Sequence, residues 1–497
     1  MRSLILAAAL TLCAPAIAQT EPVPPAAPPS VEAILATAPA GTRIGLLVVD
    51  EQGREVIAIR PDDRFIPASN TKLFTTAAAY ALLGDKMARA RLGTEEFGRY
   101  APGAFIGLAE QDGGPPHVIL YGRGDAHLSS APDCKIDCLS ELAGMVAKKA
   151  KVVADVVGDA SWFPDQRWSP GMSWNNIGTD SGTAIAALSI DDNEVRVEVR
   201  PAAAGQPPLV TSNDYFTLRN EAVTIAAGGK TSLAFERAPG SMELRLYGEI
   251  AADAAPFTDR LGVDDPAHYA AWALRRQLVG RGVAVQGTVR STYRPVALID
   301  DPKQREGRDL RLPMPRGAFM GGHTAPPLAE TVRIVNKVSQ NLYADLLLRR
   351  IGRISGTGSL ADGVAAMEQV FTAAGLPRTG WDFSDGSGMS TYNRISPRAA
   401  VALLRWSASQ PWGQEYRASM PVGGVDGTLR RRFAGTPLAG RIWAKTGTLN
   451  ATHALSGWLK TASGRELIFS IIANDVPDGT RVVPVVDAAL QAIAAAN

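Results

Sequence analysis

The chain has 497 residues, enough for two or more domains that each bury a core. Hydrophobic residues make up 46% of it and charged residues 20%, as in ordinary globular proteins. Its formal net charge of +2 is too small to indicate a nucleic-acid partner or binding to an anionic membrane surface.

The first 18 residues, MRSLILAAALTLCAPAIA, have the pattern of a secretory signal peptide. A basic start precedes an apolar run of about a dozen residues, which is too short to span a bilayer of ~30 Å. Lipid attachment at Cys13 would normally require a small residue before it, and Leu12 is not small. We therefore expect cleavage after Ala18 and export without a stable membrane anchor.

Residues 19–30 are rich in proline and predict an extended tether without a core of its own. A helix is expected at 30–38, followed by two apolar strands within 42–61 that are joined by the turn signal EQG. An alanine-rich helix then starts near Ser69. We assign residues 31–90 to the first part of a domain.

Between residues 91 and 320 glycine, proline and short strand-like runs dominate, such as HVILYGRGD and NEVRVEVRP. This composition predicts a large, mainly β insertion. One helical segment, DPAHYAAWALRRQLVGRG at 265–282, interrupts it.

Two cysteines lie in this region, Cys134 and Cys138. In an exported protein so close a pair is expected to form a local disulfide. A zinc site would need two further ligands at suitable spacing, and the five histidines are scattered singly, so we expect no metal.

From residue 321 the chain returns to strong helical periodicity, at 327–352 and 358–376. Three strand patterns follow, at residues 440–449, 451–461 and 465–474. An apolar helix at 482–497 has no basic face of the kind that binds a membrane surface. With the strands near the N-terminus, the segment 321–497 predicts an antiparallel sheet flanked by helices.

Three short motifs carry candidate chemistry. PASNTKL places the Ser69 hydroxyl three residues before Lys72 at a helix start, where both side chains share one face. The motif SQN at 339–341 begins an apolar helix, and KTG at 445–447 lies on a strand. Singly, each also fits a structural role, as a helix cap or a solvated lysine. Their order along the chain and their placement on two helix starts and a strand favour a nucleophilic serine site, because penicillin-binding proteins and class A β-lactamases carry such a set.

The chemistry explains these residue types. Ser69 attacks an amide carbonyl only if a base removes its proton, and Lys72 is that base if it is neutral. Burial and a second ammonium nearby, that of Lys445, would both lower the pKa of Lys72. Ser339 would relay a proton to the leaving amine, and Asn341 would hold Lys72 and the substrate amide.

The strand with the KTG motif is expected to align an extended peptide. Gly447 leaves room for close approach, and the hydroxyls of Thr446 and Thr448 would bind a substrate carboxylate beside the Lys445 charge. The backbone N–H groups of Ser69 and Thr448 would form the oxyanion hole.

Further runs accompany the motifs, including YGRGDAHLSS, GDASWFPDQRWSPGMSWNNIG, WDFSDGSGMSTYNRISP and PVGGVDGTLRRRF. With them, nearly all of the chain after the leader resembles the class C low-molecular-mass penicillin-binding proteins. These are the penicillin-binding protein 4-like D-alanyl-D-alanine carboxypeptidases and endopeptidases. The long stretch between Ser69 and Ser339 matches the large insertion of that family, whereas class A β-lactamases keep these motifs closer.

The resemblance implies an α/β (α+β) transpeptidase/β-lactamase-like core split by the insertion at 91–320, with a smaller nested domain around 193–253. It implies a periplasmic serine-type enzyme that cleaves peptidoglycan stem peptides through an acyl-enzyme on Ser69, needs no cofactor and is acylated by β-lactams. The run Asp385 to Gly388 is interpreted as a structural loop near the cleft. Family members often carry an acidic residue where Asn175 and Asn176 stand, which leaves the stem-peptide preference open.

Two alternatives stay open. One is a β-lactamase or esterase on the same fold, although the sequence has no E-x-x-L-N run to hold a deacylating water. The other is a non-catalytic cell-wall-binding protein, which the intact motifs argue against. The balance between carboxypeptidase and endopeptidase activity is also open, because both use the same chemistry.

Overall fold

The computed structural model describes residues 30–89, 101–305, 310 and 317–497. The expected signal peptide at 1–18 and nearly all of the expected tether at 19–30 lie outside the described residues. Within the described ranges, no helix combines the length and the apolar character that crossing a membrane requires.

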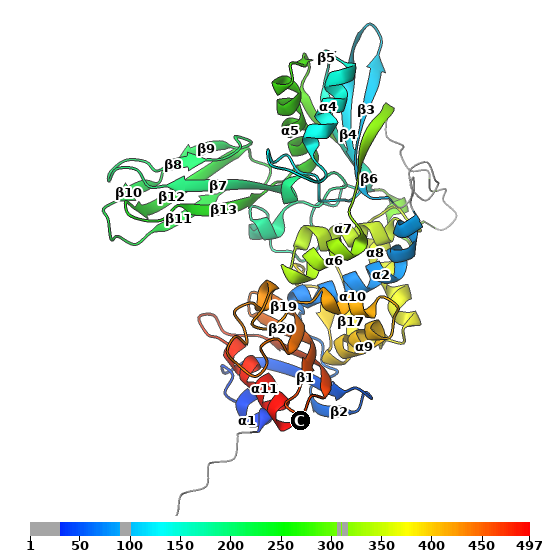
Figure 1. Cartoon of the computed structure of the whole chain (residues 1–497), viewed down its shortest axis with the longest axis vertical. Coiled ribbons are helices and arrows are strands. Elements are labelled where there is room, and N and C mark those ends of the chain that lie inside the picture. Colours follow the sequence, from blue (N-terminus) through cyan, green and yellow to red (C-terminus); the bar gives the residue numbers. More distant parts are fainter. Residues whose placement is uncertain (1–29, 90–100, 306–309, 311–316) are drawn as a thin grey trace, which may run out of the picture.

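A five-stranded antiparallel sheet is built from both ends of the chain (Figure 1). Its strands in spatial order are β19 (Ile442–Leu449), β20 (Thr452–Lys460), β21 (Glu466–Asn474), β1 (Arg43–Asp50) and β2 (Glu55–Ile59). Strand β1 pairs with β21 in a register that sets Leu46 opposite Ile471. The sheet therefore closes only when the first and last parts of the chain meet.

Successive side chains of β1 point to opposite faces of the sheet, and all of them from Ile44 to Asp50 are buried. Both faces of the sheet are therefore covered at β1. Leu46 and Val48 join the hydrophobic core beneath α1 and α11, whereas Leu47 and Val49 join the core beneath α2 and α9. These helices are α1 (Val31–Leu35), α2 (Thr71–Arg89), α9 (Pro397–Ala408) and α11 (Val483–Ala496). The predicted α/β class, an antiparallel sheet flanked by helices, is confirmed.

Helix α2 runs through the middle of a helical layer and is buried on nearly all sides, with Leu73, Phe74 and Ala77 fully inaccessible. Its neighbours in contact are α6 (Leu328–Lys337), α7 (Asn341–Gly352), α8 (Leu360–Ala373) and α9, and the short α10 (Gly413–Ala418) packs on α6 and α9. The helical pattern predicted at 327–352 is thus two helices. Ser339, with a φ of 64°, turns the chain between them.

The insertion forms a second five-stranded sheet beyond the helical layer. Its spatial order is β15 (Val289–Arg294), β6 (Val156–Pro164), β4 (Gly114–Gly122), β3 (Gly103–Gln111) and β16 (Ala318–Thr324). The expectation of a single helical segment here is wrong, because α4 (Leu139–Lys149) precedes α5 (Pro266–Gly280). Leu139, Leu142 and Val146 of α4 recur with helical spacing and are all buried, a signal that the surrounding strand-like runs obscured.

Two smaller sheets project to one side of the molecule (Figure 1). One contains β13 (Phe257–Gly262), β7 (Glu194–Arg200) and β8 (Leu209–Thr211), and the other contains β10 (Val223–Ile225), β12 (Glu243–Ala251), β11 (Ser232–Glu236) and β9 (Thr217–Asn220). Two-stranded pairs complete the described strands, namely β5 (Val152–Val153) with β14 (Ala284–Val285) and β17 (Trp381–Asp382) with β18 (Arg394–Ile395). We propose that the strands from β7 to β12 form the nested smaller domain expected around 193–253, and β13, which pairs with β7, lies just beyond that range.

Candidate active site

Ser69 lies in a single 3-10 turn, Ala68–Asn70, that leads into α2. The side chain is half-buried and its Oγ lies 2.9 Å from Lys72 Nζ. Two further contacts hold this turn: Asn70 Nδ2 donates to the Lys445 carbonyl at 3.0 Å, and Gly388 packs directly against the Ala68 carbonyl. The turn therefore presents the hydroxyl from a fixed backbone.

Lys72 is fully buried, so the alternative of a solvated first-turn lysine is wrong. Its Nζ contacts Asn341 Oδ1 at 2.6 Å and the Ser387 carbonyl at 2.6 Å, in addition to Ser69 Oγ. A neutral amine has two N–H donors and one lone pair. The two carbonyl oxygens accept the two donors, which leaves the lone pair for the Ser69 hydroxyl.

The orientation of the Asn341 amide follows from its other partner. Asn341 Nδ2 donates to the backbone carbonyl of Ser181 at 2.8 Å, and a carbonyl oxygen can only accept. Asn341 Oδ1 therefore faces Lys72. Ser181 belongs to the inserted region, so the insertion contributes a contact to this site.

Lys445 is the second fully buried lysine, which rules out the alternative of a solvated strand residue. Its Nζ donates to Ser339 Oγ at 2.8 Å and to the Thr446 carbonyl at 2.9 Å. Ser339 is not a helix cap, because Gln340 occupies the cap of α7 and accepts from Leu342 N. The left-handed backbone at Ser339 instead aims its hydroxyl at the lysine.

Burial is the main cause of the altered titration of both lysines. It lowers the pKa of Lys72 to about 8, against the raising effect of the Asp345 and Asp385 carboxylates. Burial and the charge of Lys72 hold the pKa of Lys445 well below its usual value. Burial thus lowers the pKa of Lys72 as the sequence argument expected, and repulsion between the two ammonium groups disfavours charging both at once.

Strand β19 forms the edge of the main sheet and carries the KTG motif past the Ser69 turn. Thr446 is half-buried with its Oγ1 2.8 Å from Thr428 Oγ1, and Thr448 is exposed. A Cβ on Gly447 would lie 2.6 Å from the Pro67 carbonyl oxygen, which is closer than real contacts allow. Glycine therefore lets the strand and the turn approach each other.

Replacing Gly447 with alanine should push β19 away from the Ser69 turn. Because small misplacements of reacting groups are costly, we expect the acyl transfer that the motifs predict at Ser69 to slow by about 100-fold. Overpacking should also lower the free energy of unfolding by about 1–3 kcal/mol. Stopped-flow acylation and urea denaturation measure the two effects.

The matched control for this variant is Gly144→Ala on α4, where a Cβ meets no atom within 4 Å. That variant should acylate at the wild-type rate and gain up to about 1 kcal/mol of stability. A Gly447→Ala variant that is acylated at the wild-type rate would contradict the proposed role of the close approach between β19 and the Ser69 turn.

The loop from Asp385 to Gly388 packs directly on the Ser69 turn. Asp385 accepts hydrogen bonds from Gly388 N, Ser390 N and Asn393 Nδ2 at 2.6–2.8 Å, which hold the loop in shape. The Ser387 carbonyl then reaches Lys72. The loop thus lies at the cleft and supplies a direct acceptor to it.

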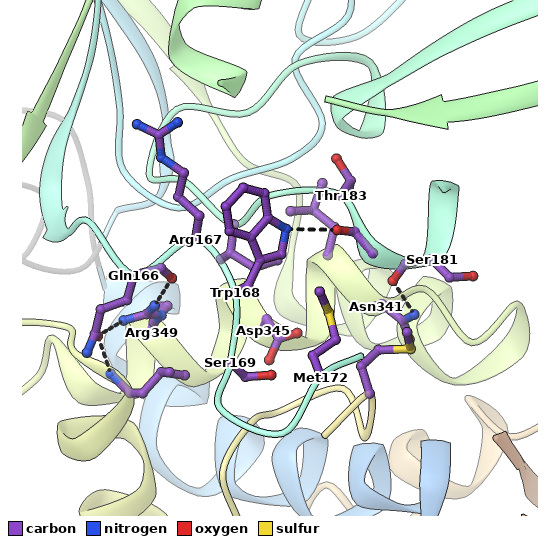
Figure 2. A pocket seen from close by; sticks show the side chains of 15 residues that line it. Gln166, Arg167, Trp168, Ser169, Met172, Ser181, Thr183, Asn341, Asp345 and Arg349 are labelled. Atoms are coloured by element: carbon purple, nitrogen blue, oxygen red, sulfur yellow. Dashed lines mark hydrogen bonds between the residues drawn. The ribbon is translucent and has the colours of Figure 1, made fainter. Parts of the chain in front are cut away.

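Several contributors to the site escaped the sequence reasoning. The carbonyls of Ser181 and Ser387 could not be found from side-chain patterns, because any residue supplies a carbonyl. Asp345 had a detectable signal, as a lone carboxylate in the apolar run NLYADLLL four residues after Asn341. Asp345 is 8% exposed and lines a cavity of about 20 Å³ between residues 166–172 and α7 (Figure 2).

The described residues contain no group of three or more histidine, cysteine, aspartate or glutamate side chains placed to hold a metal ion. This arrangement can activate a hydroxyl. The Ser69 hydroxyl contacts a buried amine, and two carbonyl oxygens orient that amine.

Comparisons with known proteins point to one family. The sequence profile of the D-Ala-D-Ala carboxypeptidase 3 (S13) family matches residues 28–304 and 310–496. A D-alanyl-D-alanine carboxypeptidase from Actinomadura sp. is 33% identical over 452 residues, which cover 87% of this chain and 78% of that protein. The D-alanyl-D-alanine carboxypeptidase DacB of Haemophilus influenzae is 24% identical over 457 residues, or 89% of this chain and 87% of that protein.

The fold is also similar to solved structures. The crystal structure of penicillin-binding protein 4 from Haemophilus influenzae matches with a TM-score of 0.74 at 22% identity, covering 92% of this chain and 97% of that chain. A complex of that protein with a β-lactam matches with a TM-score of 0.67 at 20% identity and the same coverage.

Proposed function

Because the chain belongs to the D-Ala-D-Ala carboxypeptidase 3 (S13) family, we propose that Ser69 is its acylated nucleophile and Lys72 the general base. The activity is that of a serine-type D-alanyl-D-alanine carboxypeptidase. The observation that carries the assignment is the fully buried Lys72 amine, 2.9 Å from the Ser69 hydroxyl and held by two carbonyl oxygens.

In the acylation step Lys72 takes the Ser69 proton as the Oγ attacks the carbonyl between two D-alanines. The backbone N–H groups of Ser69 and Thr448 stabilise the oxyanion. The amine leaves with a proton relayed through Ser339, whose hydroxyl contacts Lys445. Water then hydrolyses the ester and frees Ser69.

The terminal carboxylate of the peptide binds along β19, at Lys445, Thr446 and Thr448. An anion beside Lys445 favours the ammonium form of that lysine, although burial opposes it in the free protein. Gly447 keeps the bound strand close to Ser69. Cleavage of cross-links between stem peptides uses the same groups, and we include this endopeptidase activity in the proposal.

The inserted region, which we assign to residues 91–320 between core segments 31–90 and 321–497, takes part in the site. Its Ser181 carbonyl orients Asn341, which in turn orients Lys72. We therefore propose that the insertion shapes the cleft for its peptidoglycan substrate. Asn175 and Asn176 lie on the same segment, and their amides would not favour a free ammonium as a carboxylate would.

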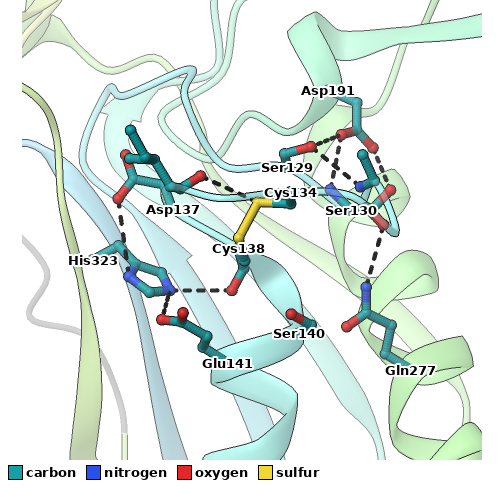
Figure 3. Close-up of a disulfide and its surroundings, with 12 residues drawn as sticks. Ser129, Ser130, Cys134, Asp137, Cys138, Ser140, Glu141, Asp191, Gln277 and His323 are labelled. Carbon is teal, nitrogen blue, oxygen red and sulfur yellow. Dashed lines mark hydrogen bonds and ion pairs between the residues drawn. A yellow bond between two sulfur atoms is a disulfide. The ribbon is translucent and has the colours of Figure 1, made fainter.

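We propose that the protein works in the periplasm. The leader-like residues 1–18 support export, and a disulfide joins Cys134 to Cys138 at the start of α4 (Figure 3). His323 of β16 contacts the Cys138 carbonyl at 3.1 Å, so the disulfide loop is tied to the insertion sheet. Such a bond persists in an oxidising compartment.

Mass spectrometry of the intact protein after exposure to benzylpenicillin tests the proposed nucleophile. We expect one adduct with the mass of the penicillin, which peptide mapping places on Ser69. An unmodified protein, or an adduct elsewhere, would contradict the proposal.

A chromogenic β-lactam tests the β-lactamase alternative. Rapid turnover would indicate a β-lactamase, whereas a long-lived adduct would indicate a peptidase.

The acylation rate should rise with pH, because only the neutral form of Lys72 accepts the Ser69 proton. A lysine is neutral above its pKa, and burial places the pKa of Lys72 at about 8. We therefore expect the rate to increase with pH below this value and to level off above it. Acylation kinetics between pH 6 and 10 measure the profile, and a rate independent of pH would refute a titrating base.

A further inference from the structure

Helix α7 aligns three polar side chains on its buried face, Asn341, Asp345 and Arg349, at successive intervals of four residues (Figure 2). Asn341 contacts Lys72 directly. Arg349 donates to the carbonyls of Gln166 and Gly358 and to the side-chain oxygen of Gln166. Asp345, between them, is a buried carboxylate to which the mechanism above gives no role.

One peptide segment connects Asp345 to Lys72. The Gly386 N–H donates to Asp345 Oδ1 at 2.7 Å. The carbonyl of the following residue, Ser387, accepts from Lys72 Nζ at 2.6 Å. Thr75 of α2 donates to the Gly386 carbonyl at 2.7 Å. The segment is thus held between α7 and α2, with Asp345 on one side and the catalytic amine on the other.

The segment has little freedom to move. A Cβ on Gly386 would lie 2.8 Å from the Ala344 carbonyl, which shows how closely the loop packs on α7. The hydrogen bond from Gly386 to Asp345 therefore sets where the Ser387 carbonyl points.

The charged groups around this pair are few and come from different elements. Asp345 on α7, Asp385 in the loop and Lys445 on β19 surround Lys72. Asp345 in turn faces Asp385, Lys72 and Arg349. The hydrogen bonds of Asp385 to Gly388, Ser390 and Asn393 hold the loop itself, which leaves Asp345 as the carboxylate between the loop and α7.

We propose that Asp345 is a positioning residue for Lys72. Its carboxylate stabilises the ammonium that Lys72 becomes during acylation, and through the Gly386 N–H it fixes the Ser387 carbonyl that orients the amine. The inference rests on the proposed roles of Ser69 and Lys72. It adds to them the group that keeps a fully buried amine basic enough to take a proton.

The proton balance is simple. The Ser69 O–H proton passes to the Lys72 lone pair while the Oγ–carbon bond forms and the carbonyl π pair moves onto oxygen. The carbon–nitrogen bond then breaks as a proton reaches the leaving amine. Asp345 transfers no proton in this step.

The direction of titration agrees with this arrangement. The Asp345 carboxylate opposes the lowering of the Lys72 pKa by burial. Burial and Asp385 raise the pKa of Asp345 to about 7, so the group is mostly ionised where Lys72 titrates. Removing the Asp345 charge should lower the pKa of Lys72, which becomes neutral at lower pH but is then a weaker base.

The test compares the pH profile of benzylpenicillin acylation in wild type and Asp345→Asn. We expect the midpoint to move down by about one pH unit or more. The limiting rate at high pH should fall by about tenfold. A lower rate with an unchanged or raised midpoint would overturn the proposal, because a purely structural residue does not shift the titration of the base.

Further variants keep the test decisive. Asp345→Glu retains the charge and should keep the wild-type midpoint, and a midpoint that falls as in Asp345→Asn would count against the proposal. Asp345→Ser removes the charge with less volume, so it replaces Asp345→Asn if that variant does not fold.

Asp362→Asn is the matched control. It removes a carboxylate that is equally buried but contacts Arg305 and Thr357. That control should lose stability and keep the wild-type midpoint.

The outcomes separate this inference from the function on which it rests. A wild type that takes up no penicillin on Ser69 contradicts the proposed nucleophile. A wild type that is acylated with a midpoint near 8, beside an Asp345→Asn variant with the same midpoint, contradicts only the role of Asp345.

Discussion

Ser69→Ala should leave a folded protein that forms no covalent adduct with penicillin. The substitution removes one hydroxyl from a half-buried position, and the contacts that hold its turn come from Asn70 and Gly388. Hydrolysis of a D-alanyl-D-alanine peptide should fall by at least about 10⁴-fold, since losing the nucleophile disables the whole catalytic unit. Intact mass and release of free D-alanine measure the two effects.

The variant also separates binding from chemistry. Non-covalent binding of the peptide should persist in Ser69→Ala, because the groups proposed to hold the carboxylate on β19 are unchanged. Ser409→Ala, at an exposed position outside the cleft, is the matched control and should form the adduct as wild type does. Covalent modification of Ser69→Ala at another serine would show that the nucleophile was assigned wrongly.

Lys72→Met should slow acylation by about 10²- to 10⁴-fold, the contribution expected of a positioned general base. Methionine has a similar length, but its thioether sulfur is not basic enough to take the Ser69 proton. The oxygens of Asn341 and Ser387 lose their donor, while the protein no longer has to bury an amine. Stability should therefore change little, and the rate is the informative readout.

Two companion variants sharpen this result. Lys72→Arg keeps a cation that does not lose its proton near neutral pH, so it should be about as slow as Lys72→Met. Lys148→Met, at an exposed position on α4, should retain the wild-type rate. If Lys72→Met kept more than about a tenth of the wild-type rate, Lys72 would not be the base.

Much of the architecture was predictable because its signals are local. The strands within 42–61 and 440–474 are rich in apolar residues, and the structure pairs them in one antiparallel sheet in which β1, β20 and β21 are largely buried. The family resemblance from the motifs was likewise confirmed by the match over nearly the whole described chain. The predicted residue Lys72 does lie within hydrogen-bonding distance of both Ser69 and Asn341.

What could not be predicted depends on contacts between distant segments. The environment of Lys72 comes from α7, the 385–388 loop and the insertion, and two of its determinants are the carbonyls of Ser181 and Ser387. The break between α6 and α7 needs a left-handed residue at 339, which the apolar period around it does not reveal. Helix α4 was missed because local runs typical of strands surround it.

The pairing of β1 with β21 has a consequence for the timing of activity. Strand β1 has no partner on its β21 side until the last strands of the chain have been synthesised, because β21 lies more than 400 residues further on. Pairings of such long range are slow to form, because closing a long loop costs entropy. A nascent or C-terminally truncated chain that lacks β19 to β21 should therefore not be acylated on Ser69.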